Sequence, residues 1–340
     1  MRTLRLALAS MLAVMAFAMV AAGCSGTGDG EGPKGNSPVR IGTMPTEDFL
    51  PMWVAEKEGL FSDAGVDVEL ITFDSAQTLS SAIAAGEVDM AMVDVMRAAK
   101  LDESGTPVVI EWVTLGTESD QGAFGILAPA DAPYTTLSEF AAAVEAGDEL
   151  ASKGIGLAAN TVPEYVFEML AEQEGIDPVV IPTQEVASLP ERYSLLASGN
   201  LGAAALPASM LDLGVAEGMV LLADDTTGDN ISQSVMIARS EFAADYQDDV
   251  MKVASAWDAA VGLIDEDPGA YIELLAQKAN LNGSVVDSYV ISEYPLAIEG
   301  GDLARIPAEL VDPLIGWMAQ KGYLSDDMEY DPGTGTFSIG

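Results

Sequence analysis

The sequence contains no histidine and one cysteine, and it has only 14 Lys and Arg against 54 Asp and Glu, a formal net charge of −40 over 340 residues. Nucleic-acid binding needs a basic surface, so this charge excludes polyanionic partners. A disulfide framework or a Cys/His zinc site needs more thiols and some imidazole. A Ser-His-Asp or Cys-His nucleophile would have no base. Composition therefore indicates an acidic, soluble protein that is not a hydrolase of the usual kind. For the chain as a whole we expect no catalytic residues, no metal and no cofactor.

The N-terminal stretch has the composition of an export signal. Arg2 and Arg5 precede a nearly unbroken apolar run over residues 7–19, which ends in small residues before Cys24. The run is too short for a membrane span, and it predicts a signal peptide over residues 1–23. Residues 20–24 (VAAGC) resemble a bacterial lipobox, although Ala21 stands where Leu or Val is more usual.

The position of the only cysteine favours lipidation over an ordinary secretory signal with a stray cysteine. Cleavage after Gly23 would leave Cys24 as the new N-terminus, and diacylation there supplies the acyl chains that stable anchoring requires. We expect a protein that is lipid-anchored at the extracytoplasmic face of the cell membrane.

The mature chain begins with a tether. Residues 24–38 contain five Gly and two Pro but no large apolar side chain, a composition typical of a flexible linker. Without residues 1–23 the chain has 317 residues, and its 12 basic and 54 acidic side chains give −42. About 300 residues remain for the fold, more than one typical domain.

Apolar strands alternate with amphipathic helices along the chain, which predicts an α/β fold with mainly parallel sheets. The first half is predicted to contain strands at Val39–Thr43, Asp67–Phe73 and Asp89–Val93, with helices at Leu50–Glu58 and Thr78–Ala85. Three amphipathic helices are predicted near the C-terminus, at Phe242–Asp265, Pro268–Ala279 and Pro307–Lys321.

The first half of the chain is echoed in the second. Ile41-Gly42-Thr43 and the E-x-E-G block ending at Gly59 reappear as Ile155-Gly156-Leu157 and the block ending at Gly175. Each half runs strand, helix ended by Gly, strand, helix ended by Gly, strand, and such glycines commonly form left-handed helix caps. The order suggests two similar lobes, with chance similarity among α/β units as the alternative.

Two crossings would join these lobes. Strands predicted at Val108–Leu115 and Ala123–Ala128 carry the chain across, and one at Ile231–Ala238 carries it back. Lobe 1 is therefore predicted to comprise residues 39–120 and 231–340, and lobe 2 residues 121–230. A ligand would lie between the lobes, at the carboxyl ends of their strands.

Several segments resemble the solute-binding proteins of ABC importers. They are Ile41–Pro45, Trp53–Phe61, Gly65–Glu69 and Ala85–Ala91. Within that group the chain is similar to the SsuA-like branch, whose members take nitrate, sulfonates, taurine and thiamine precursors, and the resemblance covers nearly all of residues 39–325. It implies a type II periplasmic-binding-protein fold, with two lobes joined by two crossing hinge segments.

The resemblance also implies a function. Such a protein captures a small molecule by hinge closure and delivers it to a membrane permease and its ATPase, acting as a monomer. We expect the ligand to be sulfonate-like or a heterocyclic precursor. One departure affects the ligand site: Gly202 stands where the repeat would match Asp89, and Ala208 follows Pro207 where many relatives carry a glutamate.

Loops after the predicted strands supply the candidate ligand-binding residues, which are Thr43, Met44, Pro45, Thr46, Glu47, Ser75, Asp94, Thr117, Asn160, Thr161, Gln184, Pro207 and Gln233. Several have structural alternatives. Asp94 could instead cap the following helix, and Thr161 with Glu164 forms a T-x-x-E capping box, a pattern repeated at Thr136/Glu139 and Ser188/Glu191. Phe49, Trp53 and Tyr165 lie near the predicted cleft, where they could stack on a heterocycle or belong to the core.

Two other classes of function remain open. An enzyme on the same fold, similar to certain menaquinone-pathway enzymes, could use carboxylate pairs as acid and base. A surface adhesin or signalling receptor would need no permease. The export signal argues against the enzyme, since such metabolism is cytosolic.

Overall fold

The computed structural model describes residues 37–117, 121, 124–226, 233–279 and 289–340, and the fold is reported for these ranges. The predicted signal peptide, Cys24 and the predicted tether up to residue 36 lie outside them. Within the described ranges, no helix has the length and apolar character needed to cross a membrane.

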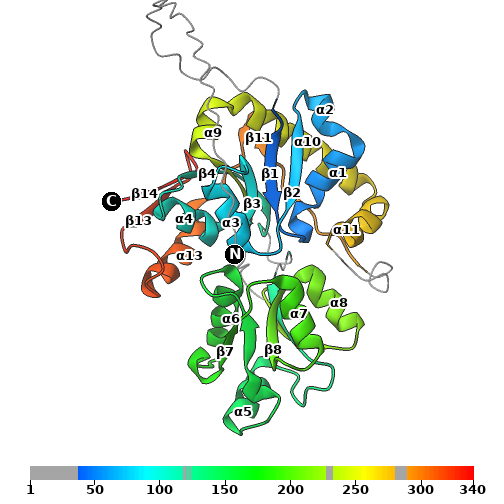
Figure 1. Cartoon of the computed structure of the whole chain (residues 1–340), viewed down its shortest axis with the longest axis vertical. Coiled ribbons are helices and arrows are strands. Elements are labelled where there is room, and N and C mark those ends of the chain that lie inside the picture. The colour runs from blue at the N-terminus through cyan, green and yellow to red at the C-terminus, as the bar shows by residue number, and fades with distance from the viewer. Residues whose placement is uncertain (1–36, 118–120, 122–123, 227–232, 280–288) are drawn as a thin grey trace, which may run out of the picture. The chain divides into compact units, whose positions relative to one another are not determined.

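Strands from both ends of the chain form a seven-stranded sheet in the order β13-β14-β4-β10-β3-β1-β2 (Figure 1). These strands are β1 (Val39–Thr43), β2 (Val68–Thr72), β3 (Met90–Asp94), β4 (Val108–Leu115), β10 (Ser234–Arg239), β13 (Met328–Asp331) and β14 (Thr336–Ile339). The sheet belongs to lobe 1.

The middle of the chain forms a second sheet, in lobe 2, with the order β7-β6-β8-β5-β9. Its strands are β5 (Phe124–Ala128), β6 (Ile155–Leu157), β7 (Thr183–Glu185), β8 (Ala203–Pro207) and β9 (Val220–Asp224). The chain thus passes between the sheets twice, from β4 to β5 and from β9 to β10. The predicted two-lobed α/β architecture is confirmed.

The prediction of mainly parallel sheets is wrong, because both sheets are mixed. Parallel pairing is confined to β1 with β2 and β3, and to β6 with β7 and β8. The strands that carry the chain between lobes pair antiparallel, β10 with β3 and β4, and β5 with β8 and β9. A strand that enters a sheet from the opposite lobe runs against the strands that point toward that lobe.

The internal echo in the sequence corresponds to a repeated unit. In lobe 1 it is β1-α1-β2-α3-β3, with α1 (Leu50–Glu58) and α3 (Ala76–Ala84). In lobe 2 it is β6-α6-β7-α7-β8, with α6 (Val162–Gln173) and α7 (Leu189–Ala197). The first strand of each unit lies between the other two. The four glycines that follow these helices all have positive φ, as left-handed caps require, and they are Gly59, Gly86, Gly175 and Gly199.

Helices cover both faces of the lobe 1 sheet. Met90 and Met92 of β3 pack in one apolar cluster with side chains of α1, α2 (Leu60–Ala64), α10 (Gln247–Glu266) and α11 (Ile272–Lys278). Ala91 and Val93 pack in a second cluster, with α3, α4 (Val95–Glu103) and α13 (Ala308–Gln320). Since successive strand residues face opposite sides, these memberships show that β3 is buried on both faces.

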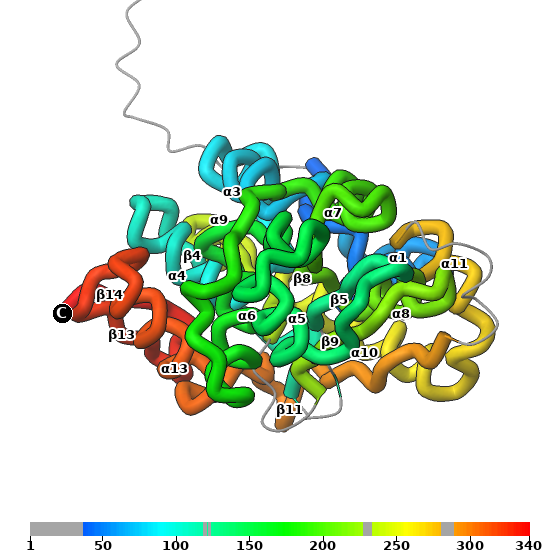
Figure 2. Tube along the Cα trace, turned by 90° about the horizontal axis from the view of Figure 1, so that it is seen from below, coloured from blue at the N-terminus to red at the C-terminus, as the bar shows by residue number. Residues whose placement is uncertain are grey.

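Figure 2 shows α13 and the C-terminal strands on one side of the chain and α10 and α11 on the other. The other helical segments are η1 (Glu47–Phe49), α5 (Leu137–Glu145), η2 (Ala151–Lys153), η3 (Pro178–Val180), α8 (Ala208–Ala216), α9 (Ser240–Asp245) and η4 (Pro268–Tyr271). A short hairpin joins β11 (Ile298–Glu299) to β12 (Asp302–Leu303).

Asp89 joins three elements of lobe 1. Its side chain is 2 % exposed and accepts from Arg40 through Nε at 3.0 Å and Nη2 at 2.8 Å. Arg239 Nη2 lies 3.4 Å from the same carboxylate. The residue precedes β3, at the strand end away from lobe 2, and it therefore stabilises the fold and is not a ligand contact.

Replacing Asp89 with Ala should lower the free energy of unfolding by about 3 kcal/mol, because two partly buried guanidinium groups lose their carboxylate. Chemical denaturation measures this loss. Asp326→Ala, which removes an exposed carboxylate, is the matched control and should change stability by less than about 0.5 kcal/mol. An equal effect of the two substitutions would show that the Asp89 network contributes little.

Candidate functional site

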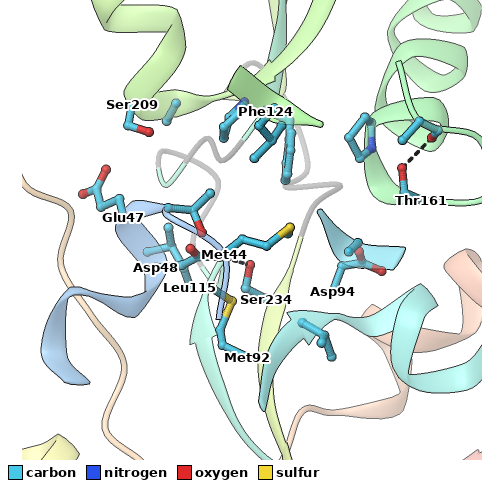
Figure 3. Close-up of a pocket in the computed structure, with 18 of the residues that line it drawn as sticks. Met44, Glu47, Asp48, Met92, Asp94, Leu115, Phe124, Thr161, Ser209 and Ser234 are labelled. Atoms are coloured by element: carbon cyan, nitrogen blue, oxygen red, sulfur yellow. Dashed lines mark hydrogen bonds between the residues drawn. The ribbon is translucent and has the colours of Figure 1, made fainter. Parts of the chain in front are cut away.

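A pocket lies between the two lobes where strands of both sheets end (Figure 3). Its empty volume is about 750 Å³, including its opening to solvent. Lobe 1 lines it with Met44, Thr46, Glu47, Asp48, Ala76, Met92, Val93, Asp94, Leu115 and Ser234. Lobe 2 lines it with Phe124, Ala158, Thr161, Pro163, Ala187, Leu189, Arg192, Pro207, Ala208 and Ser209.

The structure brings together six of the thirteen predicted ligand-binding residues at this pocket, and they are Met44, Thr46, Glu47, Asp94, Thr161 and Pro207. The other seven do not line it, and they are Thr43, Pro45, Ser75, Thr117, Asn160, Gln184 and Gln233. Some of these serve local structure: Ser75 Oγ accepts from Thr78 N as a helix cap, and Gln184 on an exposed strand donates to Lys153 O.

Glu47 is anchored by its own lobe. Its carboxylate accepts from Tyr289 OH and from Ser292 N, the latter at 2.8 Å, and Tyr294 OH donates to its carbonyl oxygen at 3.0 Å. Burial raises the pKa of Glu47, while hydrogen bonds from Tyr289 and Ser292 lower it. With its acceptors occupied in this way, Glu47 holds the segment from Tyr289 to Tyr294 against the first loop of lobe 1.

Two other carboxyl groups lie in the lobe 1 wall. Asp48 Oδ2 accepts from Ser234 Oγ, and Asp94 Oδ1 accepts from Arg97 N at 2.6 Å as the cap of α4. Burial raises the pKa of both groups, and the negative charge of Asp48 further raises that of Asp94. The capping and ligand-facing interpretations of Asp94 are therefore compatible, since one oxygen caps the helix and the residue also lines the pocket.

Arg192 lines the pocket from lobe 2 and was missed by the sequence analysis. It is 1 % exposed, and its Nε and Nη1 donate to Val186 O and Ala205 O at 2.9 and 2.8 Å. Burial lowers its pKa to about 10, so it stays charged at neutral pH. The sequence did contain a signal for it. Arg192 is a basic residue in the first turn of α7, and α7 occupies the same place in the lobe 2 unit as α3 in the lobe 1 unit.

The start of α8 also faces the pocket. Ala208 and Ser209 line it, and Ser209 is 1 % exposed with no hydrogen-bond partner for Oγ among the described residues. Pro207, the cap residue, supplies no side-chain acceptor to the first amides of the helix. This part of lobe 2 therefore presents hydrogen-bond donors, namely the Ser209 hydroxyl and the first amides of the helix.

The capping box predicted at α6 forms only in part. Thr161 Oγ1 donates to Ala158 O at 2.5 Å and does not cap the helix, whereas Glu164 Oε2 accepts from Asn160 N at 2.7 Å. Pro163 has no N–H, so this helix start offers few free amides to an anion. The boxes elsewhere differ too: Thr136 Oγ1 accepts from Glu139 N, but Ser188 makes no side-chain cap.

The three aromatic residues named in the sequence analysis belong to the core. Phe49 and Trp53 pack edge to face at a centroid distance of 5.6 Å, and both are at most 1 % exposed. Tyr165 packs against Trp317 at 5.3 Å. None of them lines the pocket, whose aromatic lining residue is Phe124.

The lobes also touch beside the pocket, where α6 meets α13. Trp317 Nε1 donates to Glu168 Oε2 at 3.0 Å, and Lys321 Nζ lies 2.5 Å from Glu168 Oε1. Tyr323 OH donates to the Glu164 carboxylate at 2.9 Å. The contact is therefore mixed: Lys321 is about one-third exposed, whereas Trp317 and Glu164 are buried, and Trp317 also packs against Tyr165 of the other lobe.

Comparison with known proteins agrees with this geometry. Residues 32–278 match the model of the NMT1-like family. No curated protein matches the chain in sequence.

Solved structures share the fold at low identity. The alkanesulfonate-binding protein SsuA from Xanthomonas axonopodis pv. citri bound to MOPS matches with a TM-score of 0.68 and 16 % identity, over 85 % of this chain and 94 % of that one. The periplasmic aliphatic sulphonate-binding protein SsuA from Escherichia coli gives 0.64 and 15 %, over 84 % and 93 %. The periplasmic nitrate-binding protein NrtA from Synechocystis PCC 6803 gives 0.64 and 14 %, over 85 % and 82 %.

Replacing Glu47 with Ala should free the segment that it holds. The change leaves the Tyr289 hydroxyl and the Ser292 amide without their acceptor, at a cost of about 3 kcal/mol in the free energy of unfolding. Hydrogen exchange of residues 289–297 should accelerate, while exchange in lobe 2 stays unchanged.

Glu47→Gln is the control for this experiment, because its amide oxygen still accepts from Ser292 N. Exchange of residues 289–297 in this variant should be slower than in Glu47→Ala and close to that of the unmodified protein. Unaltered exchange of residues 289–297 in the Ala variant would show that another contact holds the segment.

Proposed function

The chain belongs to the NMT1-like family, and on that basis we propose that it is the extracytoplasmic substrate-binding component of an ABC importer. It captures one small molecule between its two lobes and delivers it to a permease and ATPase complex. The relatives by structure include sulfonate-binding and nitrate-binding proteins. The proposed ligand is a sulfonate-like compound or a heterocyclic precursor.

The observation that carries this proposal is the pocket itself, which is lined by ten residues from each lobe. A ligand held there contacts both lobes at once, and its affinity depends on their separation. Such a ligand stabilises the closed arrangement over an open one, which gives a permease a signal of occupancy.

Binding without chemistry fits the pocket better than catalysis. Among the described lining residues there is no Cys or His, and the carboxylate of Glu47 is committed to Tyr289 and Ser292. Asp94 caps a helix through one of its oxygens. On these grounds we propose that the protein binds its ligand without reacting with it and is not an enzyme.

We propose that the hinge consists of the two crossings, between β4 and β5 and between β9 and β10. Lobe 1 then comprises residues 39–120 and 231–340, and lobe 2 residues 121–230. Both crossings are short, so closure can occur by rotation about them while each sheet stays intact. The contact between α6 and α13 forms and breaks during this motion.

The proposed location is the outer face of the cell membrane. Residues 1–23 have the pattern of a signal peptide, and lipidation of Cys24 would anchor the folded domain through residues 25–38. The mature domain then acts as a monomer, tethered near its permease.

Filling the pocket should abolish binding. Native mass spectrometry identifies the small molecule that is recovered with the purified protein. At 100 times its Kd this ligand should stabilise the folded protein by about 2.7 kcal/mol and raise the melting temperature by several degrees. Ala208→Trp places an indole in the pocket and should weaken binding at least tenfold. Ala216→Trp, at an exposed position of the same helix, should retain it. Equal binding by both variants would place the ligand elsewhere.

Replacing Cys24 with Ala should release the protein from the membrane, because the acyl chains have no other attachment point. Fractionation of cells that express either form measures the change, and metabolic labelling with palmitate reports the lipid. Ser25→Ala, next to the cleavage site, should leave the protein in the membrane fraction. An unlabelled, cytosolic protein in both cases would contradict the proposed location.

A further inference from the structure

The polar groups of the pocket are divided between the lobes by the sign of their charge. Asp48 and Asp94 lie in the wall from lobe 1, and Arg192 and Ser209 lie in the wall from lobe 2. Figure 3 shows Ser209 on the opposite side of the pocket from Asp48 and Asp94. This division limits which small molecules fit.

The lobe 1 wall can accept further hydrogen bonds. Asp48 Oδ1 is buried and makes no hydrogen bond of good geometry among the described residues, although the Thr46 hydroxyl lies close enough to lower the pKa of Asp48, and Oδ2 accepts from the Ser234 hydroxyl. Asp94 uses Oδ1 for the helix cap, and no described residue donates to its Oδ2. Arg97, the nearest cation to Asp94, donates to Asn160 O at 3.4 Å and does not line the pocket. A buried carboxyl group gains most from a partner that donates hydrogen bonds or carries positive charge.

The lobe 2 wall holds a cation without an anionic partner. Among the described residues, Arg192 donates to the carbonyl oxygens of Val186 and Ala205 and makes no ion pair within 4.0 Å, although the charge of Glu185 raises its pKa somewhat. The nearest acidic side chain is Glu185, which accepts instead from Ala159 N at 2.8 Å. A guanidinium that is 1 % exposed and not neutralised gains strongly from an oxyanion.

Ser209 supports the same assignment independently of charge. Its hydroxyl is buried, lines the pocket and has no partner among the described residues, which is unusual for a buried polar atom. It lies in the first turn of α8, a nine-residue helix whose N-terminal end carries partial positive charge. An acceptor atom of a ligand would satisfy this hydroxyl on the wall that Arg192 also lines.

The surface between the two polar walls is apolar. Met44, Met92 and Leu115 line the pocket from lobe 1, and Phe124 and Leu189 line it from lobe 2. These side chains favour a ligand with a hydrocarbon or aromatic body, since each Å² of apolar surface that is buried on binding contributes about 25 cal/mol.

We propose that the ligand is an amphipathic zwitterion that spans the lobes. An amino-type N–H donor lies against Asp48 and Asp94, an apolar body fills the centre, and a carboxylate or sulfonate lies against Arg192 and Ser209. The proposal rests on the proposed function and narrows its ligand class. It also explains closure, because only a ligand with both groups satisfies the two walls together.

Three probes of matched shape test this assignment by isothermal titration calorimetry. The zwitterion is 4-(aminomethyl)benzoate, the anion without an amine is 4-ethylbenzoate, and the cation without an acid is 4-isopropylbenzylammonium. We expect the zwitterion to bind at least tenfold more tightly than either singly charged probe.

Substitutions assign each end of the probe to its wall. Asp48→Asn and Asp94→Asn keep the hydrogen bonds within lobe 1. They should lower the affinity for the zwitterion at least fivefold and leave the affinity for 4-ethylbenzoate undiminished. Ser209→Ala removes no hydrogen bond among the described residues, so this variant should fold normally. It should lower the affinity for both carboxylate probes, the zwitterion and 4-ethylbenzoate, by about threefold. Arg192→Gln should weaken both acids more strongly. If it does not fold, the Ser209 variant carries the test of the lobe 2 wall.

Two outcomes overturn the proposal. One is binding of 4-ethylbenzoate as tight as that of the zwitterion, which would assign an ordinary anion site. The other is that none of the three probes binds. Neither result contradicts the proposed importer function, which has its own test. That function is contradicted if native mass spectrometry finds no small molecule and Ala208→Trp binds ligand as Ala216→Trp does.

Discussion

The two passages of the chain between the sheets are the constraint on which the rest of the structure depends. Because the chain leaves lobe 1 after β4 and returns at β10, the strand ends of both lobes point toward each other. Loops that follow parallel strands in an α/β sheet are where ligands bind. The crossings therefore place two such sets of loops face to face and create one pocket from two halves. They also make both sheets mixed, since the crossing strands pair antiparallel.

The electrostatics of the pocket depend on this division. Each lobe on its own would carry its buried charged groups beside solvent, the carboxyl groups in lobe 1 and Arg192 in lobe 2. When the lobes approach, water is displaced and those groups lose solvation, which is unfavourable without partners. A ligand that brings the complementary groups offsets this loss. In this account, recognition and closure are one equilibrium.

The sequence predicted the fold well where local pattern determines structure. The strand at Val39–Thr43 and the helix at Leu50–Glu58 have the predicted bounds, and the echo in the second half became a second βαβαβ unit. Close packing underlies the repeated Gly42 and Gly156. A Cβ at Gly42 would lie 2.6 Å from Leu79, and one at Gly156 would lie 2.5 Å from Leu201. The prediction of strand direction was wrong, because the direction of a strand depends on the lobe from which the chain enters the sheet.

The site was predicted less completely, for a physical reason. Sequence patterns indicate which loops reach the cleft but not which side chain in a loop turns into it, so Glu47 and Asp94 line the pocket while Ser75 and Gln184 do not. Arg192 and Ser209 were missed because both lie within the first turn of a helix and resemble ordinary helix residues. The structure draws attention to them because both are buried at the pocket and the Ser209 hydroxyl has no partner among the described residues.

Ligand-dependent closure is the central claim, and the distance between the lobes tests it most directly. A Cys24→Ala background has no thiol, so Ser81→Cys in α3 and Ser194→Cys in α7, both exposed, can be spin-labelled uniquely. Pulsed electron paramagnetic resonance would then measure the distribution of distances between the labels with and without the ligand recovered from the protein. The account predicts a shorter and narrower distribution with ligand. An unchanged distribution at saturating ligand would contradict it.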